Sequence, residues 1–429
     1  MNHELLKKVI FDQHEIIRNF TIVEREYDFD MNANYVVIGL RRAGKSTLLY
    51  KLVQDLVASG TDWNQIIYIN FEDERLAEFS LSDFDDILAV QAELSNKTGW
   101  FFLDEVQNVY GWEKFARRMA DSKEHTFITG SNAKMLSAEI ENRLGGRYLT
   151  KYVTPYNFRE YLKAKNTDSS EEAILSTKGS GKIRKELESY FYFGGFPENI
   201  AYRDKREYVS SIYQKVLLGD IASRNNIRNT NGLRLLMKKI AESVKDEVSY
   251  SKLYNTLNTI GVNISKDAVI DYIRYARQSF LIFAIRSWFS KFVDKETTPK
   301  YYFNDNGLLN LFLDRAEPRL LENLVAITLW NAYRDRVYYL KSQHLDADFF
   351  VEDTGEVIQV AYSLSDTSDD RETKLLVQAA HSVKEATRFI IITWEEEKVL
   401  TQDDITIEVI PIWKWLLCYS NNFCKSTTK

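Results

Sequence analysis

The sequence predicts an α/β fold with a mostly parallel sheet, followed by a helical region and a second α/β domain at the C-terminus. Strand-like and helical stretches alternate from residue 35 to about residue 155. Helical periodicity dominates residues 183–280, and strands mix with helices again from residue 281 onward. Alternation of strands and helices is typical of βαβ units, whose strands run parallel.

The elements of the first part can be assigned in order. Residues 1–20 have the apolar spacing of an amphipathic helix, and residues 21–29 alternate like a strand. The following apolar runs predict the strands of the sheet: NYVVIG, QIIYINFE, GWFFLDEV, HTFITG and RYLTKYVTP. Residues 165–182 are polar with scattered Gly and Ser, which predicts a linker or loop.

Composition excludes several classes of protein. The 56 basic and 62 acidic residues give a net charge of −6, so any nucleic-acid surface must be a local patch. Cys418 and Cys424 have neither metal-ligand nor redox spacing, which argues against a disulfide framework or a zinc site. Neither a signal-peptide core nor an apolar run of the roughly 18–20 residues needed for a membrane span is present. We therefore expect a cytoplasmic protein without a membrane partner.

Residues 39–46 read GLRRAGKS and match the phosphate-binding pattern G-x-x-x-x-G-K-[ST]. Glycines allow the backbone N–H groups to point at phosphate oxygens, a lysine adds positive charge at the β- and γ-phosphates, and the hydroxyl binds Mg²⁺. A glycine-bearing surface loop is the alternative, but this loop follows a strand and opens a helix, as the motif requires. The predicted nucleotide-binding residues are Gly39, Arg42, Ala43, Gly44, Lys45, Ser46 and Thr47.

The apolar strand FFLDEV ends in two carboxylates about sixty residues after the loop. In a nucleotide hydrolase, Asp104 would hold through water the Mg²⁺ that Ser46 binds, and Glu105 would polarise the attacking water. A strand that ends in solvated carboxylates is common on its own. The presence of a phosphate loop in the same chain favours a role for these carboxylates in nucleotide hydrolysis.

Polar side chains also end the strand HTFITG. Thr129, Ser131 or Asn132 is a candidate sensor of the γ-phosphate, and a turn or helix cap at Ser131 is the alternative. The segment RLGGRY supplies Arg143 and Arg147, either of which could reach the γ-phosphate of a neighbouring subunit in a homo-oligomer. A surface arginine is the alternative, and we select Arg147. The predicted catalytic residues are thus Lys45, Glu105, Ser131 and Arg147.

At this point the sequence resembles a known family. The segments GLRRAGKSTLL, FEDERL, FFLDEVQNVYGWEKFARRM, ITGSNAKML and RLGGRYLTKYVTPYNFREYL are similar to the AAA-type P-loop ATPases of bacteria and archaea. In that family the ATPase module precedes a C-terminal domain of unknown function with a restriction-endonuclease-like core. YFYFGGFPE, KYYFNDNGLL and LENLVAITLW extend the similarity over almost the whole chain. The resemblance implies an ATPase with ATP and Mg²⁺ as its nucleotide and cofactor.

The middle of the chain suggests a winged helix. Three helices are expected within residues 233–280, the third capped by Ser265, and a β-hairpin follows them. In winged helices the third helix commonly enters the major groove of DNA. The basic residues of this third helix and of the wing are Arg274, Arg277, Arg286, Lys291, Lys295 and Lys300. Asp267 and Asp271 dilute this charge, and a purely structural lid is the alternative.

The C-terminal domain is expected to be a degenerate nuclease. The resemblance implies Glu322 and Asp348 as metal-binding acids of a nuclease site, but Gln359 stands where the next acid is expected and Ala361 where the lysine is expected. Lys374 is a candidate substitute for the lysine, and no replacement acid is evident. The interpretation is a vestigial site of Glu322, Asp348 and Gln359 on a fold retained as a scaffold or binding surface.

These observations predict four domains: an AAA-like ATPase at 1–164, a helical lid or linker at 165–232, a winged helix at 233–305 and a degenerate nuclease-like domain at 306–429. We expect a Mg²⁺-dependent ATPase that switches domain or subunit arrangement and acts on nucleic acid. An ATP-gated protein-interaction switch is the first alternative. An ATP-dependent nuclease is the second, and Gln359 and Ala361 contradict it.

Overall fold

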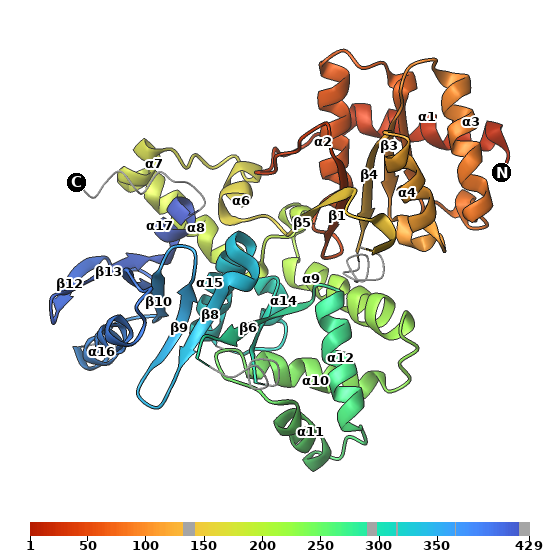
Figure 1. The fold of residues 1–429 in the computed structure, drawn as a ribbon. Helices are drawn as coiled ribbons and strands as arrows, with labels where there is room; N and C mark the ends of the chain where they lie inside the picture. The colour runs from red at the N-terminus through yellow and green to blue at the C-terminus, as the bar shows by residue number, and fades with distance from the viewer. Residues whose placement is uncertain (132–141, 290–297, 315, 365, 420–429) are drawn as a thin grey trace. The chain divides into compact units, whose positions relative to one another are not determined.

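The computed structural model describes residues 1–131, 142–289, 298–314, 316–364 and 366–419. They form two compact units, one of residues 1–154 with 278–280 and the other of residues 155–277 with 281–429 (Figure 1). A search of the described helices finds none with the length and apolar character that crossing a membrane requires.

The first unit contains the parallel sheet that the sequence predicts. All five expected strands are present, and every pair of neighbours in the sheet is parallel. They are β1 (Asn34–Gly39), β2 (Ile66–Asn70), β3 (Trp100–Asp104), β4 (His125–Gly130) and β5 (Tyr148–Val153), in the order β2-β3-β4-β1-β5. Gly39 pairs with Val153 and Asp104 with Asn70, so the functional candidates meet at the carboxyl edge of the sheet.

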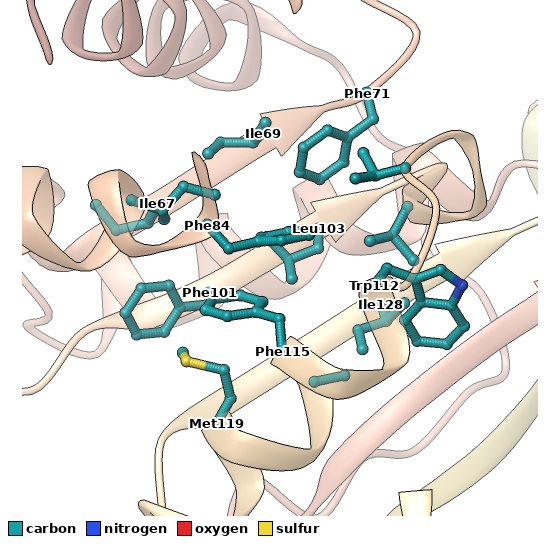
Figure 2. Packing of buried hydrophobic residues seen from close by; sticks show 14 of the residues in the cluster. Ile67, Ile69, Phe71, Phe84, Phe101, Leu103, Trp112, Phe115, Met119 and Ile128 are labelled. Atoms are coloured by element: carbon teal, nitrogen blue, oxygen red, sulfur yellow. The ribbon is translucent and has the colours of Figure 1, made fainter. Parts of the chain in front are cut away.

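Helices bury the faces of this sheet. They are α1 (His3–Asn19), α2 (Lys45–Ala58), α3 (Phe84–Leu94) and α4 (Trp112–Asp121), with 3₁₀ turns η1 (Trp63–Gln65), η2 (Glu74–Leu76), η3 (Leu81–Asp83) and η4 (Val106–Asn108). Figure 2 shows Phe101 and Leu103 of β3 facing Phe115 of α4 and Phe84 of α3. The rings of Phe84 and Phe115 stack at 4.3 Å between centroids. Burial of each such side chain contributes roughly 1.5–3 kcal/mol, which fixes the strands that carry the site.

The strand predicted at residues 21–29 is wrong, because this segment belongs to no β-ladder. Side chains hold it in place of backbone pairing. Arg25 donates from its two Nη atoms to the carbonyl oxygens of Ala43 and Thr154, each at 2.8 Å. The Tyr27 hydroxyl accepts from the Thr154 N–H at 3.2 Å. The alternating pattern of this segment therefore reflects the hydrogen bonds of Arg25 and Tyr27, which lie two residues apart, and not pairing with a strand of the sheet.

The second unit begins with helices. They are α6 (Phe158–Ala164), α7 (Glu171–Leu175), α8 (Thr177–Phe193), η6 (Pro197–Ile200), α9 (Lys205–Lys215), the π-helical η7 (Val216–Ser223), α10 (Thr230–Glu242), α11 (Tyr250–Thr259) and α12 (Lys266–Gln278). The linker expected at 165–182 is wrong, because α7 and the start of α8 lie there. Ser170 and Ser176 are the N-caps of these helices and accept the N–H groups of Ala173 and Gly179 at 3.3 and 3.0 Å.

A mixed eight-stranded sheet completes the second unit. Its strands are β6 (Ile282–Ser287), β7 (Lys300–Phe303), β8 (Val337–Lys341), β9 (Asp346–Val351), β10 (Glu356–Val360), β11 (Arg388–Thr393), β12 (Lys398–Gln402) and β13 (Ile405–Pro411), in the order β12-β13-β11-β10-β9-β8-β6-β7. The remaining elements are α14 (Asn306–Asn310), α15 (Glu317–Tyr333), η8 (Arg334–Arg336), α16 (Asp366–Ser382) and α17 (Ile412–Tyr419). The antiparallel hairpin β6–β7, assigned to the wing from the sequence, belongs to this same sheet. The predicted domain boundaries stay predictions.

Two glycine-rich segments, FGGFPEN and FNDNG, meet at Asp305. This carboxylate is buried, and it accepts the N–H groups of Gly195 at 2.8 Å and Leu308 at 3.2 Å. Asn306 and Asn323 extend the network, because Asn323 donates to Asn306 at 2.9 Å and to the Phe303 carbonyl at 3.1 Å. The two segments therefore form one buried polar joint.

Replacement of Asp305 by alanine is expected to destabilise the second unit by roughly 1–3 kcal/mol, since two buried N–H groups lose their acceptor. Burial raises the pKa of Asp305 to about 6. Between about pH 4 and about pH 6 the folded state therefore keeps a proton on Asp305 that the unfolded state loses. The contribution of Asp305 to the free energy of unfolding falls as the pH rises through this window, by at most ~1.4 kcal/mol per pH unit. Denaturant unfolding across this window tests both points. If the free energy of unfolding changed with pH equally in the wild type and in Asp305→Asn, the predicted pH dependence would be contradicted.

Candidate functional site

The loop between β1 and α2 has the curled backbone that the sequence predicts. Gly39 ends β1 so close to β5 that a Cβ atom there would lie 1.9 Å from the carbonyl oxygen of Val153. Gly44 precedes α2 with a φ of 96°, a left-handed conformation that favours glycine. No side chain caps the first turn of α2, so its N–H groups remain directed at the loop. Such a helix N-terminus favours anions.

Lys45 lies within this loop and not in solvent. It is 5% exposed, and its Nζ donates to the carbonyl oxygens of Gly39 and Leu40, each at 3.3 Å. Its Nζ is also 3.6 Å from Oε1 of Glu105. The structure thus brings the predicted phosphate-binding lysine and the predicted catalytic carboxylate into contact.

Asp104 is fully buried at the end of β3 and is surrounded by hydroxyl groups. Its Oδ1 accepts from the Thr129 hydroxyl and its Oδ2 from the Tyr68 hydroxyl at 2.8 Å. Ser46 also hydrogen-bonds to it. Burial, and next the charge of Glu105, raise the pKa of Asp104. An ionised carboxylate here requires a nearby cation, and the pairing with Ser46 gives the two oxygen donors expected for Mg²⁺ in a phosphate loop.

Glu105 follows in a left-handed conformation, with a φ of 51°. Its N–H donates to the Thr129 hydroxyl at 2.9 Å, while its Oε2 accepts from Gln107 and from the Ser131 hydroxyl, the latter at 3.2 Å. Burial opposes ionisation, but the charges of Lys45 and Arg41 and the hydrogen bonds from Gln107 and Ser131 together outweigh it and lower the pKa of Glu105. The carboxylate is therefore ionised near neutral pH and held by three side chains.

Sequence reasoning missed Tyr68, Gln107 and Arg25. Tyr68 resembles any core aromatic residue of a strand, and only the pairing of β2 with β3 reveals its contact with Asp104. Gln107 lies two residues after Glu105, a spacing that could have suggested it. Arg25 supports the loop through the carbonyl oxygen of Ala43, a long-range contact that carries no local signal.

The two arginines selected from the sequence lie at different places. Arg147 directly precedes β5, at the amino edge of the sheet, and its Nε donates to Asp121 at 2.5 Å. That edge is opposite the one that carries Lys45 and Glu105, so the structure does not bring Arg147 to the site of its own chain. Arg143 contacts Glu113 in the first turn of α4, and α4 starts at the carboxyl edge because it follows β3. A role for Arg147 toward a neighbouring subunit stays a prediction.

The residues predicted for the second unit are partly brought together. Glu322 on α15, Asp348 on β9 and Gln359 on β10 form one buried group. Lys300 was expected on an exposed basic wing, which is wrong, because it is 3% exposed and faces Asp348. No replacement acid is evident in the sequence, but the structure places Glu372 of α16 within hydrogen-bonding contact of Gln359.

Other candidates remain at the surface or outside the described residues. Arg274 and Arg277 are exposed on α12, and Arg274 pairs with Asp271 at 2.7 Å. Lys374 is exposed on α16. Asn132, Lys291 and Lys295 lie outside the described residues. Within the described part of the chain, no group of three or more His, Cys, Asp or Glu residues is arranged to hold a metal ion.

Two parts of the chain match known families. Residues 32–162 match the AAA domain, and residues 184–319 match a domain of unknown function (DUF8612). An uncharacterized protein of Methanocaldococcus jannaschii is 32% identical over 433 residues, covering 97% of this chain and 96% of that protein. An uncharacterized protein of Haemophilus influenzae is 31% identical over 392 residues, covering 89% of this chain and 94% of that protein. The structure of a Walker-type ATPase of Pyrococcus abyssi covers 71% of this chain and 95% of that chain, at 14% identity and a TM-score of 0.40.

Proposed function

We propose that this chain, which belongs to the family of archaeal and bacterial AAA-domain proteins that includes these two relatives, binds Mg²⁺-ATP and hydrolyses it to switch the arrangement of its domains or subunits. The observation that carries the proposal is the convergence of Lys45, Ser46, Asp104 and Glu105 at one edge of the parallel sheet. These are the groups that phosphoryl transfer in a phosphate-loop enzyme needs.

The residues fit ATP and Mg²⁺ by the chemistry of their donors. Backbone N–H groups from Gly39 to Ser46 would hold the phosphates at the N-terminus of α2. The Ser46 hydroxyl would bind Mg²⁺ and Asp104 would hold the ion through water, a donor set that needs no cage of protein carboxylates. Bound Mg²⁺ neutralises charge on the phosphates.

Glu105 would act as the residue that polarises the attacking water. Its lowered pKa keeps it able to accept a proton, and Ser131 and Gln107 fix its orientation. Lys45 now contacts Glu105 and two loop carbonyl oxygens. Turnover requires it to exchange these partners for phosphate oxygens, which leaves Glu105 free to face water.

Tyr68 is expected to position Asp104, since its hydroxyl holds the Oδ2 atom within the buried core. Tyr68→Phe should raise the Mg²⁺ concentration that half-saturates ATP hydrolysis by ~10-fold, in line with the effect of residues that orient metal ligands, with a smaller change in kcat. Tyr148→Phe is the matched control, because the hydroxyl of this tyrosine of the same unit donates to the carbonyl oxygen of Ala116 at 2.7 Å. An unchanged Mg²⁺ dependence in Tyr68→Phe would exclude this role.

We propose nucleic acid as the partner of the switch. Support comes from α10, α11 and α12 followed by the β6–β7 hairpin, with Arg274 and Arg277 exposed on the third helix. A protein partner is the second candidate, favoured by the net charge of −6 and by the burial of Lys300, which removes one cation from the wing.

The two partners are distinguished by ATP hydrolysis measured with and without duplex and single-stranded DNA, alongside retention on DNA over a salt gradient. DNA contact predicts stimulated hydrolysis and salt-sensitive retention, both reduced in Arg274→Glu/Arg277→Glu. Lys182→Glu/Lys185→Glu on the exposed face of α8 is the charge-matched control. Hydrolysis that ignores DNA, with no retention, would exclude nucleic acid and favour a protein partner.

A further inference from the structure

Five charged side chains converge inside the second unit, far along the chain from one another. We call Lys245, Lys300, Glu322, Asp348 and Glu372 the ionic cluster. Lys245 Nζ is 3.3 Å from Oε2 of Glu322, and Lys300 Nζ is 3.8 Å from Oδ1 of Asp348. Glu322, Lys300 and Asp348 are 0%, 3% and 7% exposed. Charges are rarely buried to this degree without a function or a strict pairing requirement.

Neighbouring groups fix the three carboxylates in place. Oε1 of Glu322 accepts from the Tyr302 hydroxyl at 2.9 Å, and Oδ2 of Asp348 accepts from the Val360 N–H at 2.9 Å. The side chain of Gln359 links Asp348 to Glu372, because its Oε1 accepts from the backbone N–H of Asp348 at 3.2 Å and the side chain hydrogen-bonds to the Glu372 carboxylate. Gln359 is thus occupied in organising the acids.

The two lysines lie on different segments, which backbone hydrogen bonds join. Lys245 lies in the turn after α10, and Lys300 begins β7. A β-bridge joins Glu247 to Lys300, and the Val248 N–H donates to the Pro299 carbonyl oxygen at 3.2 Å. Lys245 has a φ of 90°, which a side-chain-bearing residue rarely adopts. This strained backbone conformation directs the ammonium group of Lys245 at Glu322. Such strain persists where the contacts of the surrounding structure enforce it.

Charge balance explains why the lysines are needed. The ionic cluster holds three carboxyl groups and two ammonium groups, so one proton on a carboxyl group makes it neutral. Lys245 lies beside Glu322 and Lys300 lies beside Asp348, so each ammonium group has a carboxylate partner and one carboxyl group of the cluster is left over.

We propose that the ammonium groups of Lys245 and Lys300 take the place of a divalent cation in this carboxylate pocket, so that the pocket is metal-independent and does not hydrolyse phosphodiesters. Glu322 and Asp348, the acids that the family resemblance assigns to a nuclease site, are paired with ammonium groups of the chain itself, and the lysines tie the turn after α10 to the sheet. Removal of an ammonium group would convert the pocket into a latent divalent-cation site.

The test uses Tb³⁺ luminescence of the full chain, sensitised by Tyr302 and by Tyr339, whose ring centroid lies 5.3 Å from Lys300 Nζ. All proteins carry Asp104→Asn to weaken the metal site of the first unit. The pocket signal is defined as the part that Asp348→Asn removes. We expect no such signal with both lysines present, and a saturable one-to-one signal with Lys300→Met. Lys300→Arg, which keeps the charge, should stay dark.

Two outcomes would overturn the proposal. A signal lost on Asp348→Asn in the protein with both lysines would mean that the pocket already binds the ion. A folded Lys300→Met protein, judged by circular dichroism, that gains no signal would mean that the ammonium groups do not stand in for a cation. If Lys300→Met does not fold, Lys245→Met decides by the same two criteria, because Lys245 is one-third exposed and its loss is milder. ATP hydrolysis does not enter either criterion.

Discussion

Glu105→Gln is expected to lower ATP hydrolysis by ~10²–10⁴-fold, the contribution typical of a positioned general base, while ATP binding stays close to that of the wild type. Glutamine keeps the shape of the side chain and an oxygen for the Ser131 hydroxyl, but it cannot accept the proton of the attacking water. Phosphate release and equilibrium binding of a fluorescent ATP analogue separate the two effects.

Glu78→Gln is the matched control for this substitution. Glu78 is an exposed residue of the same unit, and its replacement by glutamine removes the same negative charge. The Glu78→Gln protein should hydrolyse ATP at the wild-type rate. Hydrolysis by Glu105→Gln at that rate too would remove Glu105 from the mechanism, and loss of ATP binding in Glu105→Gln would mean that its contact with Lys45 supports the loop and not the chemistry.

Gly39→Ala is expected to destabilise the first unit by about 3 kcal/mol or more, because the new methyl group has no room. It would lie 1.9 Å from the carbonyl oxygen of Val153 and 2.9 Å from its carbonyl carbon, and both atoms belong to the neighbouring strand. Neither a rotamer change nor a flexible side chain can relieve this contact. Denaturant unfolding of the full chain measures the loss.

Gly181→Ala provides the comparison for Gly39→Ala. A Cβ at Gly181 meets nothing within 4 Å, and this residue lies inside α8, where alanine is favoured over glycine by roughly 0.5–1 kcal/mol. It should therefore leave stability unchanged or raise it. Wild-type stability of Gly39→Ala would contradict the close approach of β1 and β5.

Local patterns were sufficient to predict the parallel sheet and the phosphate loop. Strands β1 to β4 are largely buried, as expected for strands covered on both faces, whereas the edge strand β5 is largely exposed. The loop motif has a fixed spacing in a fixed context. Residues 21–29 and 165–182 were assigned wrongly because their local signals are ambiguous. Alternation does not show whether a strand partner exists, and Ser and Gly serve helix caps as well as loops.

Contacts between distant segments could not be read from the sequence. Lys300 was assigned to a basic wing because the sequence around it does not indicate that it faces the carboxylate of Asp348. Tyr68 and Glu372 reach the acids they support only through the pairing of strands or the packing of α16. In each case the missing information is the register between elements, which depends on packing of the whole unit.

The most direct test of the central claim is calorimetric titration of the full chain with ATP in the presence and absence of Mg²⁺. We predict one nucleotide bound per chain, weakened when Mg²⁺ is chelated and lost in Lys45→Ala, because the buried ammonium group of Lys45 lies against the loop that is to hold the phosphates. Absence of binding by the wild type, or equal binding by Lys45→Ala, would contradict the assignment of this loop as the ATP site.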